Sequence, residues 1–372
     1  MAARKQVVFC TDGIFPHAIG GMQRHSALLI EELARNGNFS IIVIHPHKEK
    51  VFDASLGIQE IPLHFTNNKG SYLLNCYKYS IKVFEQLQLF PDAIIYSQGL
   101  SVWKGISKVK DRLIINPHGL EPYQTIELFK KIKALRFRLI FNYLFRKARI
   151  VISLGGRLTG ILHKITGSPG KVVVIPNAVI VGELPVRAFN KEPLNLLFVG
   201  RFSYNKGIHV LMNAIRNLNK EGYKNRLVFN LVGKGPLFDY YVKNFSFPNV
   251  HFLGFASDED LMRYYIENDL FVFPTLYEGM PTVVLEAMAK GMPVIVSDTG
   301  ATAELVDKKN GFLIEKNNLR VLTWAIQSFY QKNADQRQVL SQSSYQRVKE
   351  KFTWQLVAQR HEELFNTFIA DQ

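Results

Sequence analysis

Cysteines are scarce in this chain of 372 residues, and long apolar runs are missing. Cys10 and Cys76 stand alone without a metal-ligand spacing, so we expect two buried thiols in a reducing compartment rather than a disulfide. No uninterrupted apolar run reaches the length of about 18 residues that a membrane-spanning helix needs. The start of the chain, MAARKQVVFCTDGIF, lacks the long apolar core of a signal peptide. The sequence therefore predicts a soluble, cytoplasmic protein.

Acidic residues are scarce in the first half. Residues 1–182 contain 24 lysines and arginines against 11 aspartates and glutamates, whereas residues 183–372 contain 22 against 20. Almost all of the net charge of +15 therefore lies in the first half. We expect an anionic partner to meet that half of the protein.

Residues 128–149 form the most basic segment. They include eight basic residues and no acidic one, interleaved with leucine, isoleucine and phenylalanine. The pattern predicts a basic amphipathic helix, which can lie on an anionic membrane surface at the inner face of the membrane. A core-facing helix with a solvated basic face fits the pattern equally well. Nucleic acid is not expected as a partner, because no helix-turn-helix, zinc or RNA-binding signature accompanies the charge.

Short apolar strands alternate with helices in both halves of the chain. This alternation predicts parallel sheets built from right-handed β-α-β units. A proline-containing connector over residues 176–193 separates the two blocks. The predicted fold class is α/β, with Rossmann-like, doubly wound domains over residues 1–182 and 183–350 and a final helix over 351–372. Two such domains make a central cleft, and ligands of open parallel sheets lie outside the carboxyl ends of the strands.

The most informative stretch runs from Leu270 to Gly291 and reads as strand, loop and helix. Pro281 suits the first helical position, and Gly291 suits a left-handed cap after the helix. Glu278 in the loop and Glu286 on the helix bracket this turn. A helix N-terminus binds anions, while nearby carboxylates can hold hydroxyl groups of a sugar and a ribose. Alternatively, one glutamate complements the helix dipole and the other is simply solvated.

Two cations occur in the loop GRFSYNKG, after an earlier apolar strand. Arg201 suits bidentate contact with phosphate oxygens, and Lys206 acts as a point charge. Fixed cations stabilise the negative charge that builds on a departing diphosphate. Cations in a polar loop are, however, often only solvated.

Taken in order, Leu194–Ile215, the Glu-x7-Glu turn and Met292–Ile314 resemble the retaining glycosyltransferases of family 4, the group 1 glycosyltransferases with GT-B architecture. The resemblance implies metal-independent transfer of a sugar from a nucleoside diphosphate sugar to a glycan or lipid-linked acceptor, as in cell-surface polysaccharide assembly. It implies no cofactor, a UDP-sugar in preference to GDP or ADP, and a last helix that crosses back to the first domain.

The resemblance also implies roles for single residues. Glu278, His118, Arg201 and Lys206 are the expected catalytic residues, with His118 steadying the positive charge on the sugar. Taken without the resemblance, His118 reads as an ordinary core or surface histidine. Residues expected to bind the donor as well are Gly21, Gly233, Leu253, Gly279, Met280, Thr282, Val283 and Glu286. Residues expected near the acceptor are His17, Gly20 and Arg24, although the glycine pair also fits a simple turn.

Two departures from the family pattern stand out. Gly119 follows His118 where many relatives have aspartate, so the match at that histidine is partial. Pro281 replaces a common glycine and has no amide hydrogen to donate, which leaves the identity of the donor sugar open.

Asp258 and Asp260 imitate an Asp-x-Asp metal motif. Ser257 precedes them at the spacing of a helix cap, so we expect them to be structural and predict no metal. Two other functions fit the sequence. One is a nucleotide-sugar epimerase on the same architecture, and the other is a basic binding protein without catalysis.

Overall fold

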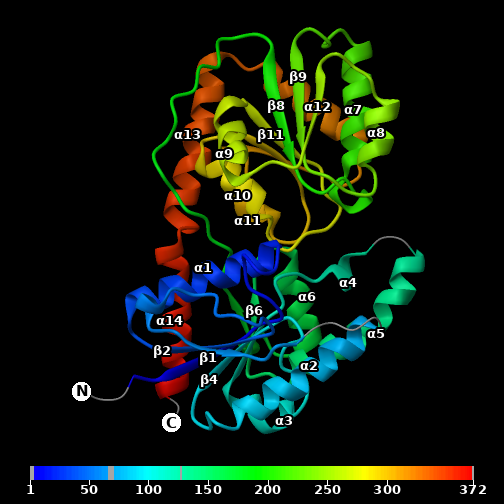
Figure 1. Ribbon diagram of the computed structural model, residues 1–372. Helices are drawn as coiled ribbons and strands as arrows, with labels where there is room; N and C mark the ends of the chain where they lie inside the picture. Colours follow the sequence, from blue (N-terminus) through cyan, green and yellow to red (C-terminus); the bar gives the residue numbers. More distant parts are fainter. Residues whose placement is uncertain (1–3, 66–70, 126–127, 371–372) are drawn as a thin grey trace. The chain divides into compact units, whose positions relative to one another are not determined.

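The computed structural model describes residues 4–65, 71–125 and 128–370, which form two compact units. Unit 1 consists of Met1–Asn177 together with Trp354–Gln372, and unit 2 consists of Ala178–Thr353. Each unit contains one parallel sheet with helices on both faces (Figure 1). The prediction of two Rossmann-like α/β domains is therefore confirmed.

The unit 1 sheet has seven parallel strands in the order β3-β2-β1-β4-β5-β6-β7. Its strands are β1 Gln6–Cys10, β2 Ser40–His45, β3 Gln59–Pro62, β4 Ile94–Gln98, β5 Leu113–Asn116, β6 Ile150–Ser153 and β7 Val172–Val174. The central strands are apolar and buried, as expected of a sheet covered on both faces. The strand order reverses between β1 and β4, because the chain runs outward from β1 to β3 before it returns to β4.

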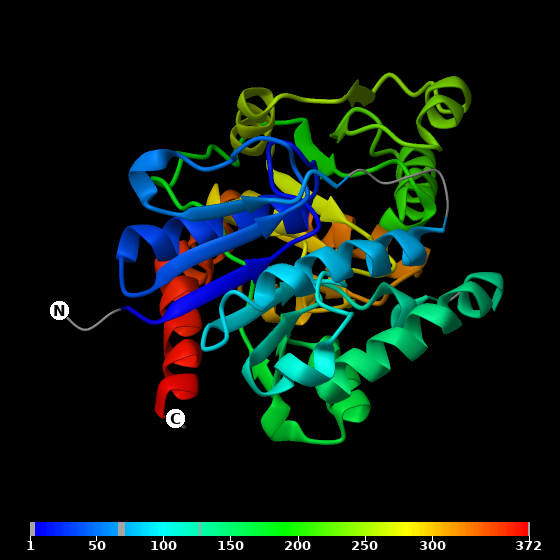
Figure 2. The same ribbon diagram turned by 60° about the horizontal axis from the view of Figure 1, so that its bottom comes forward.

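Helices from both ends of the chain cover the unit 1 sheet. They are α1 Gly21–Asn36, α2 Tyr72–Leu87, α3 Ile106–Val109, α4 Glu121–Gln124, α5 Leu128–Lys147, α6 Arg157–Thr166 and α14 Trp354–Ala370. The last helix, α14, packs beside α1 (Figure 2). The α1 helix ends at Gly37, which has a positive φ of 69° and caps the last turn.

The unit 2 sheet has six parallel strands in the order β10-β9-β8-β11-β12-β13. They are β8 Leu194–Val199, β9 Leu227–Val232, β10 Val250–Gly254, β11 Leu270–Phe273, β12 Val294–Ser297 and β13 Gly311–Ile314. Its helices are α7 Ile208–Lys220, α8 Phe238–Asn244, α9 Asp258–Glu267, α10 Thr282–Ala289, α11 Thr302–Leu305, α12 Leu319–Tyr330 and α13 Ala334–Lys351. Here the strand order reverses between β8 and β11.

The α10 helix begins one residue later than predicted. Pro281 has an extended backbone conformation at the N-cap, and Thr282 is the first helical residue. No side chain caps this end of the helix. At the other end, Gly291 adopts a left-handed conformation with a φ of 68°, as predicted. Proline suits the N-cap position of α10 because its backbone nitrogen carries no hydrogen that would need a hydrogen-bond acceptor.

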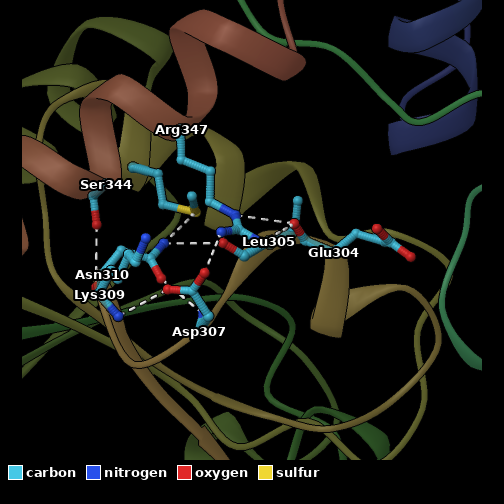
Figure 3. Close-up of polar contacts among 8 residues, drawn as sticks. Glu304, Leu305, Asp307, Lys309, Asn310, Ser344 and Arg347 are labelled. Atoms are coloured by element: carbon cyan, nitrogen blue, oxygen red, sulfur yellow. Dashed lines mark hydrogen bonds and ion pairs between the residues drawn. The ribbon is translucent and has the colours of Figure 1, made fainter.

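A polar cluster lies between α13 and the turn before β13, two of the three unit 2 elements, β13, α12 and α13, that were not predicted from the sequence. The Arg347 guanidinium contacts the Asp307 carboxylate at 2.5 Å and donates to the Glu304 carbonyl (Figure 3). Asn310 donates to the Leu305 carbonyl and accepts from the Asp307 amide, each at 2.8–2.9 Å. These contacts anchor α13 to the turn that precedes β13.

Both cysteines are free thiols, as predicted. The prediction that both are buried is confirmed for Cys10 at the end of β1 but wrong for Cys76 on α2, which is only half-buried. No helix within the described ranges is both long and apolar enough to cross a membrane.

Candidate functional site

The loops that follow β8 and β11 meet at the point where the unit 2 strand order reverses. The Asn205 carbonyl accepts a hydrogen bond from the Leu276 amide at 2.8 Å, and the Thr275 hydroxyl oxygen lies 3.1 Å from the same carbonyl oxygen. These contacts tie the cation-bearing loop to the loop that carries Glu278. In open parallel sheets, this is the position at which ligands bind.

Lys206 and Glu278 form an ion pair across these two loops. Lys206 Nζ lies 2.5 Å from Glu278 Oε1, and the two side chains are 24% and 11% exposed. The buried Thr275 hydroxyl donates to the same carboxylate oxygen at 2.9 Å. The ammonium also lies 5.5 Å from the centre of the Phe273 ring. Two of the predicted catalytic residues are thus held in direct contact by buried neighbours.

Gly207 makes the close approach of the two loops possible. Its φ is +70°, and a Cβ atom there would lie 1.8 Å from the Pro274 carbonyl oxygen. Only glycine combines this backbone conformation with so little space. Gly207 therefore brings Lys206 against the end of β11.

Arg201 lies exposed beside the next loop, which follows β9. The Phe202 amide donates to the Lys234 carbonyl at 3.1 Å, which joins the loops after β8 and β9. Gly233 has a φ of 125°, and a Cβ atom there would lie 2.0 Å from the Gly200 carbonyl oxygen. The Gly233 amide donates to the carbonyl of Gly254, the neighbour of Leu253, at 2.6 Å. The structure thus brings Arg201, Gly233 and Leu253 to one edge of the sheet.

Gly300 packs closely against the backbone of the turn before α10. This glycine has a φ of 54°, and a Cβ atom there would lie 2.4 Å from the Gly279 carbonyl oxygen. The Ala301 amide donates to that same oxygen at 2.8 Å. Met280 is buried, whereas Thr282 and Val283 at the start of α10 are partly exposed.

Glu286 lies one turn further along α10. The buried Tyr265 hydroxyl donates to its carboxylate at 2.8 Å. Burial, together with the nearby Glu286 carboxylate, raises the pKa of Tyr265 well above its usual value, so the phenol keeps its proton. Tyr265 therefore orients Glu286, and neither helical spacing nor residue type indicated this role.

In unit 1, the residues predicted near the acceptor lie around the start of α1. The Arg24 guanidinium stacks 4.5 Å from the centre of the Phe15 ring, and the backbone amide of Arg24 donates to the Gly20 carbonyl at 3.0 Å. His17 is exposed, with its ring 5.1 Å from that of His47. A Cβ atom on Gly21 would meet nothing within 4 Å, so open space faces this residue.

His118 follows β5 and has an unusual positive φ of 54°. Its amide donates to the Asn116 side-chain oxygen at 3.0 Å, which supports this backbone conformation. Its ring packs edge-on against His25 with the centres 5.0 Å apart. Burial, together with the nearby His361, lowers the pKa of His118 to about 3, so the imidazole is neutral at pH 7.

A buried hydrogen-bond chain connects His118 to the C-terminal helix. Asn116 donates to the Tyr96 hydroxyl at 2.9 Å, and that hydroxyl lies 3.1 Å from His361 Nε2 on α14. The second nitrogen of His361 lies 2.8 Å from the Val357 carbonyl oxygen. Since Nδ1 must donate to that carbonyl, Nε2 is the acceptor and Tyr96 is its donor. The sequence offered no signal for this chain, because its members come from three separate elements.

The acidic pair lies in the first turn of α9, and the Ser257 side chain caps this helix, as predicted. The Ser257 hydroxyl oxygen accepts from the Asp260 amide at 3.0 Å, and the Asp260 carboxylate pairs with Arg263 at 2.8 Å. Across the described parts of the chain, no group of three or more histidine, cysteine, aspartate or glutamate side chains could hold a metal ion.

Sequence profiles of two families match almost the whole chain. The profile described as Glycosyltransferase Family 4 matches residues 19–182, and the one described as Glycosyl transferases group 1 matches residues 183–347. An uncharacterised glycosyltransferase of Methanocaldococcus jannaschii is 28% identical over 346 residues, which are 91% of this chain and 92% of that protein. The capsular polysaccharide biosynthesis glycosyltransferase CapM of Staphylococcus aureus is 29% identical over 182 residues, or 47% and 46% of the two chains.

Solved structures share the fold over nearly the full length. The sucrose-phosphate synthase of Thermosynechococcus elongatus superposes with a TM-score of 0.80 at 20% identity and covers 99% of this chain and 100% of its own. Anabaena HepE, solved in complex with UDP and glucose, has a TM-score of 0.70 at 18% identity, with 98% and 100% covered. The chain belongs to the group 1 glycosyltransferases of family 4 and is a glycosyltransferase of the GT-B architecture.

Proposed function

We propose that this glycosyltransferase moves a sugar from a nucleoside diphosphate sugar to a glycan or lipid-linked acceptor, with retention of configuration and without a metal. The observation that carries the proposal is the Lys206–Glu278 pair at the point where the unit 2 strand order reverses. One site there offers a cation for the diphosphate and a carboxylate for sugar hydroxyl groups.

Each residue has a distinct task in the proposed reaction. Arg201 and Lys206 stabilise the negative charge that forms on the diphosphate when its bond to the sugar breaks. Glu278 accepts hydrogen bonds from the sugar, and Glu286, oriented by Tyr265, accepts them from the ribose. The acceptor oxygen bonds to the sugar carbon on the face that the diphosphate leaves, and its proton passes to the departing phosphate. His118, neutral at pH 7, supports the positive charge on the sugar ring.

UDP is the nucleotide we favour. HepE has the same fold and was solved with UDP and with UDP-glucose. The turn after β9, closed by the Gly233–Gly254 hydrogen bond, would border the uridine. Pro281 supplies no amide hydrogen, so recognition of the sugar rests on Glu278 and the turn that follows it.

Cell-surface polysaccharide assembly is the process we propose for the acceptor. CapM is named for capsular polysaccharide biosynthesis, and the Bacillus subtilis relative TuaC is named as a putative teichuronic acid biosynthesis glycosyltransferase. Such acceptors are built at membranes, which agrees with the surplus of basic residues in the first half.

The α5 helix is the surface we propose for contact with an anionic membrane. It displays four apolar side chains at helical spacing along one exposed face, with exposed fractions of 45–65%, namely Ile132, Leu135, Leu139 and Tyr143. Lys131 and Arg136 lie exposed beside them. A helix that only faced the core would bury such residues, whereas a membrane can take up the apolar stripe while the cations meet lipid headgroups.

The proposal is tested by nucleotide binding and product stereochemistry. We expect UDP, but not GDP or ADP, to raise the melting temperature by several degrees, since a ligand at 100 times its Kd adds about 2.7 kcal/mol. Glu286→Gln should reduce this shift, while the exposed Arg263→Ala should not. The transferred sugar should keep its anomeric configuration by NMR, with unchanged rate in EDTA. An inverted product would overturn the proposed retention of configuration, and inhibition by EDTA would overturn the proposed independence of metal. No shift with any of the three nucleotides would overturn the proposed nucleotide-sugar donor.

An epimerase would be revealed by the fate of the donor. It would convert the donor to its C2 epimer without an acceptor, whereas the proposed transferase would not.

A further inference from the structure

A cationic pocket lies at the amino edge of the unit 1 sheet. It has a volume of about 340 Å³, and its basic residues are Lys110, Arg146, Lys147, Arg149 and Lys171. These residues lie just before β5, β6 and β7, whereas His118 follows the carboxyl end of β5. The pocket is therefore distinct from the residues that the proposed transfer reaction uses.

Hydrogen bonds to main-chain carbonyls hold two of the cations in place at the end of α5. Lys171 Nζ donates to the Arg146 carbonyl at 2.9 Å and to the Ala148 carbonyl at 3.2 Å. Arg146 Nε donates to the Ile165 carbonyl at 3.0 Å. An ammonium has three N–H donors and a guanidinium has five, so each group can bind an anion in addition to these carbonyls.

Arg149 is fixed in the short turn between α5 and β6. Its backbone amide donates to the Leu113 carbonyl at 3.1 Å, and its side chain donates to the Asp111 carbonyl at 3.2 Å. The guanidinium also lies 4.3 Å from the centre of the Phe368 ring on α14. The cations thus converge from several elements that are already tied together, so a ligand would lose little affinity to their ordering.

The positive charge of the pocket is largely uncompensated, because the carbonyl partners are neutral. Among the described residues that line the pocket, Asp111 is the only carboxylate. Its side chain is 88% exposed and lies 3.8 Å from Lys110, and such an exposed pair contributes little. The lining therefore has a surplus of four positive charges on one concave surface. A concave surface of one sign concentrates the electric field and attracts ions of the opposite sign.

The C-terminus of α5 explains only part of this cluster. A cation at the last carbonyls of a helix is favourable, and Lys171 has that role. The exposed Lys147 and Lys110 add further positive charge beside it, and charges of one sign repel one another. An anion bound among them would relieve this repulsion.

A compact phosphate group with more than one negative charge matches the pocket. Arginine can pair with two phosphate oxygens at once, and lysine adds a point charge. The volume is near the lower end of the range of small-ligand sites, about 300–1,000 Å³. A carboxylate with a single charge would leave most of the surplus uncompensated.

We propose that the cationic pocket binds a phosphate group with about two or more negative charges, as in a pyrophosphate or a phosphomonoester. The phosphate belongs either to a soluble phosphorylated compound or to a lipid headgroup. This inference goes beyond the proposed transfer reaction, because it uses none of the residues assigned to that reaction.

Lysine acetylation in the presence of inorganic pyrophosphate tests the proposal residue by residue. Full-length protein is treated briefly with acetic anhydride, and the modification of each lysine is followed by mass spectrometry. Pyrophosphate should slow the acetylation of Lys110 and Lys147 in a saturable manner, whereas sodium chloride at the same ionic strength should not. Each protection curve reports on the pocket itself, even where pyrophosphate also binds near Lys206.

Charge reversal in the pocket should weaken binding. With Lys110 as the reporter, Lys147→Glu should raise the pyrophosphate concentration for half-protection by about tenfold or more, as expected for the loss of a hydrogen bond between charged groups. Lys147→Arg keeps the charge and should keep the affinity. Lys78→Glu makes the same change of charge on an exposed residue of α2 that does not line the pocket, so it should have no effect.

Three outcomes would overturn the proposal. They are absence of protection at Lys110 and Lys147, equal protection by sodium chloride, and equal weakening by Lys147→Glu and Lys78→Glu. Circular dichroism of each variant shows that the fold is intact.

Vesicles distinguish the two sources of the phosphate. Phosphatidic acid presents a phosphomonoester, whereas phosphatidylglycerol presents a phosphodiester with a single charge. If a lipid headgroup is the ligand, Lys147→Glu should weaken sedimentation with phosphatidic acid vesicles more than with phosphatidylglycerol vesicles. Equal sedimentation of wild type and Lys147→Glu with both vesicles, together with pyrophosphate protection, would identify a soluble phosphorylated compound.

The UDP melting shift, measured on the same variants, separates this site from the proposed reaction. Lys147→Glu should leave that shift unchanged. A UDP shift without protection of Lys110 and Lys147 would refute only the cationic pocket. Protection without any nucleotide shift would refute the proposed nucleotide-sugar donor and leave the phosphate site in unit 1.

Discussion

Lys206 Nζ contacts Glu278 Oε1 at 2.5 Å, so the cation proposed for the diphosphate and the carboxylate proposed for the sugar are direct partners. Each group neutralises the other in a site where both are largely shielded from water. In the proposed reaction, a bound donor would replace both partners, since its phosphates would pair with the lysine and its hydroxyl groups would donate to the glutamate. The ion pair would thus hold both groups at the positions where they meet the donor.

Glu278→Gln should lower donor turnover by about 100-fold or more, because removal of one group that acts in the transition state costs this much in other enzymes. The amide keeps the shape of the side chain, so circular dichroism should stay unchanged. Near-normal turnover would remove Glu278 from the mechanism.

Lys206→Met should reduce both turnover and stability. The stability loss should be about 1–2 kcal/mol, because the Glu278 carboxylate keeps its hydrogen bond from Thr275 but loses its charged partner. The double variant with Glu278→Gln should lose less stability than the sum of the two single losses, as measured by urea unfolding. Strict additivity would mean that the contact contributes nothing.

Arg201→Ala should lose far more activity than stability, since this side chain is exposed. We expect kcat/KM to fall by about 10- to 100-fold while the melting temperature stays constant. Arg263→Ala, another exposed arginine of unit 2, is the matched control and should change neither.

Gly207→Ala should destabilise the protein by about 3 kcal/mol, because the added methyl group meets the Pro274 carbonyl and the positive φ is strained for alanine. Gly160→Ala should instead be neutral or stabilising by about 0.5–1 kcal/mol. That glycine lies inside α6, where a Cβ atom meets nothing within 4 Å. Urea unfolding of both variants compares them, and equal effects would contradict the steric argument.

Stability should fall as the pH drops below about 6.5. Burial lowers the pKa of His361 to about 4 and that of His118 to about 3, while the unfolded chain binds protons near pH 6.5. Between these values the unfolded state holds more protons, so each histidine costs up to about 1.4 kcal/mol of stability per pH unit. Asp12 has the opposite effect and adds stability as the pH falls toward about 4, because the pKa of its carboxyl is raised to about 6 in the folded state.

His25→Leu should make this loss of stability with falling pH less steep. Burial lowers the pKa of His25 well below its usual value, so replacing this histidine removes one of the groups that destabilise the folded state as the pH falls. Chemical unfolding at pH 7, 6 and 5 measures the slope. An identical slope in the variant would show that His25 is not buried in its neutral form.

Anionic vesicles should bind the protein at low salt and release it at high salt, whereas neutral vesicles should not bind it. Leu135→Asp on the exposed face of α5 should abolish binding in sedimentation. Val339→Asp, which changes an equally exposed apolar residue on α13, is the control. Binding that survives Leu135→Asp would place the membrane contact elsewhere.

Elements with strong local signals could be predicted from the sequence alone. The strands and helices of the β-α-β units were predictable because apolar runs, glycine caps and cap residues act within a few positions. The motif around Glu278 and the loop with Arg201 and Lys206 also identified the family. The elements β13, α12 and α13 were not predicted. The two helices do carry local signals, since the Asn318 side chain caps α12 and a capping box of Asn333 and Gln336 starts α13. The attachment of α13 to the turn before β13, in contrast, depends on the distant contact of Arg347 with Asp307.

The partners of the site residues depend on tertiary folding and were not evident from the sequence. The contact of Lys206 with Glu278, the orientation of Glu286 by Tyr265 and the chain from His118 to His361 join residues far apart in sequence. Local sequence patterns encode secondary structure, whereas these partnerships arise from the order of strands in the folded sheet.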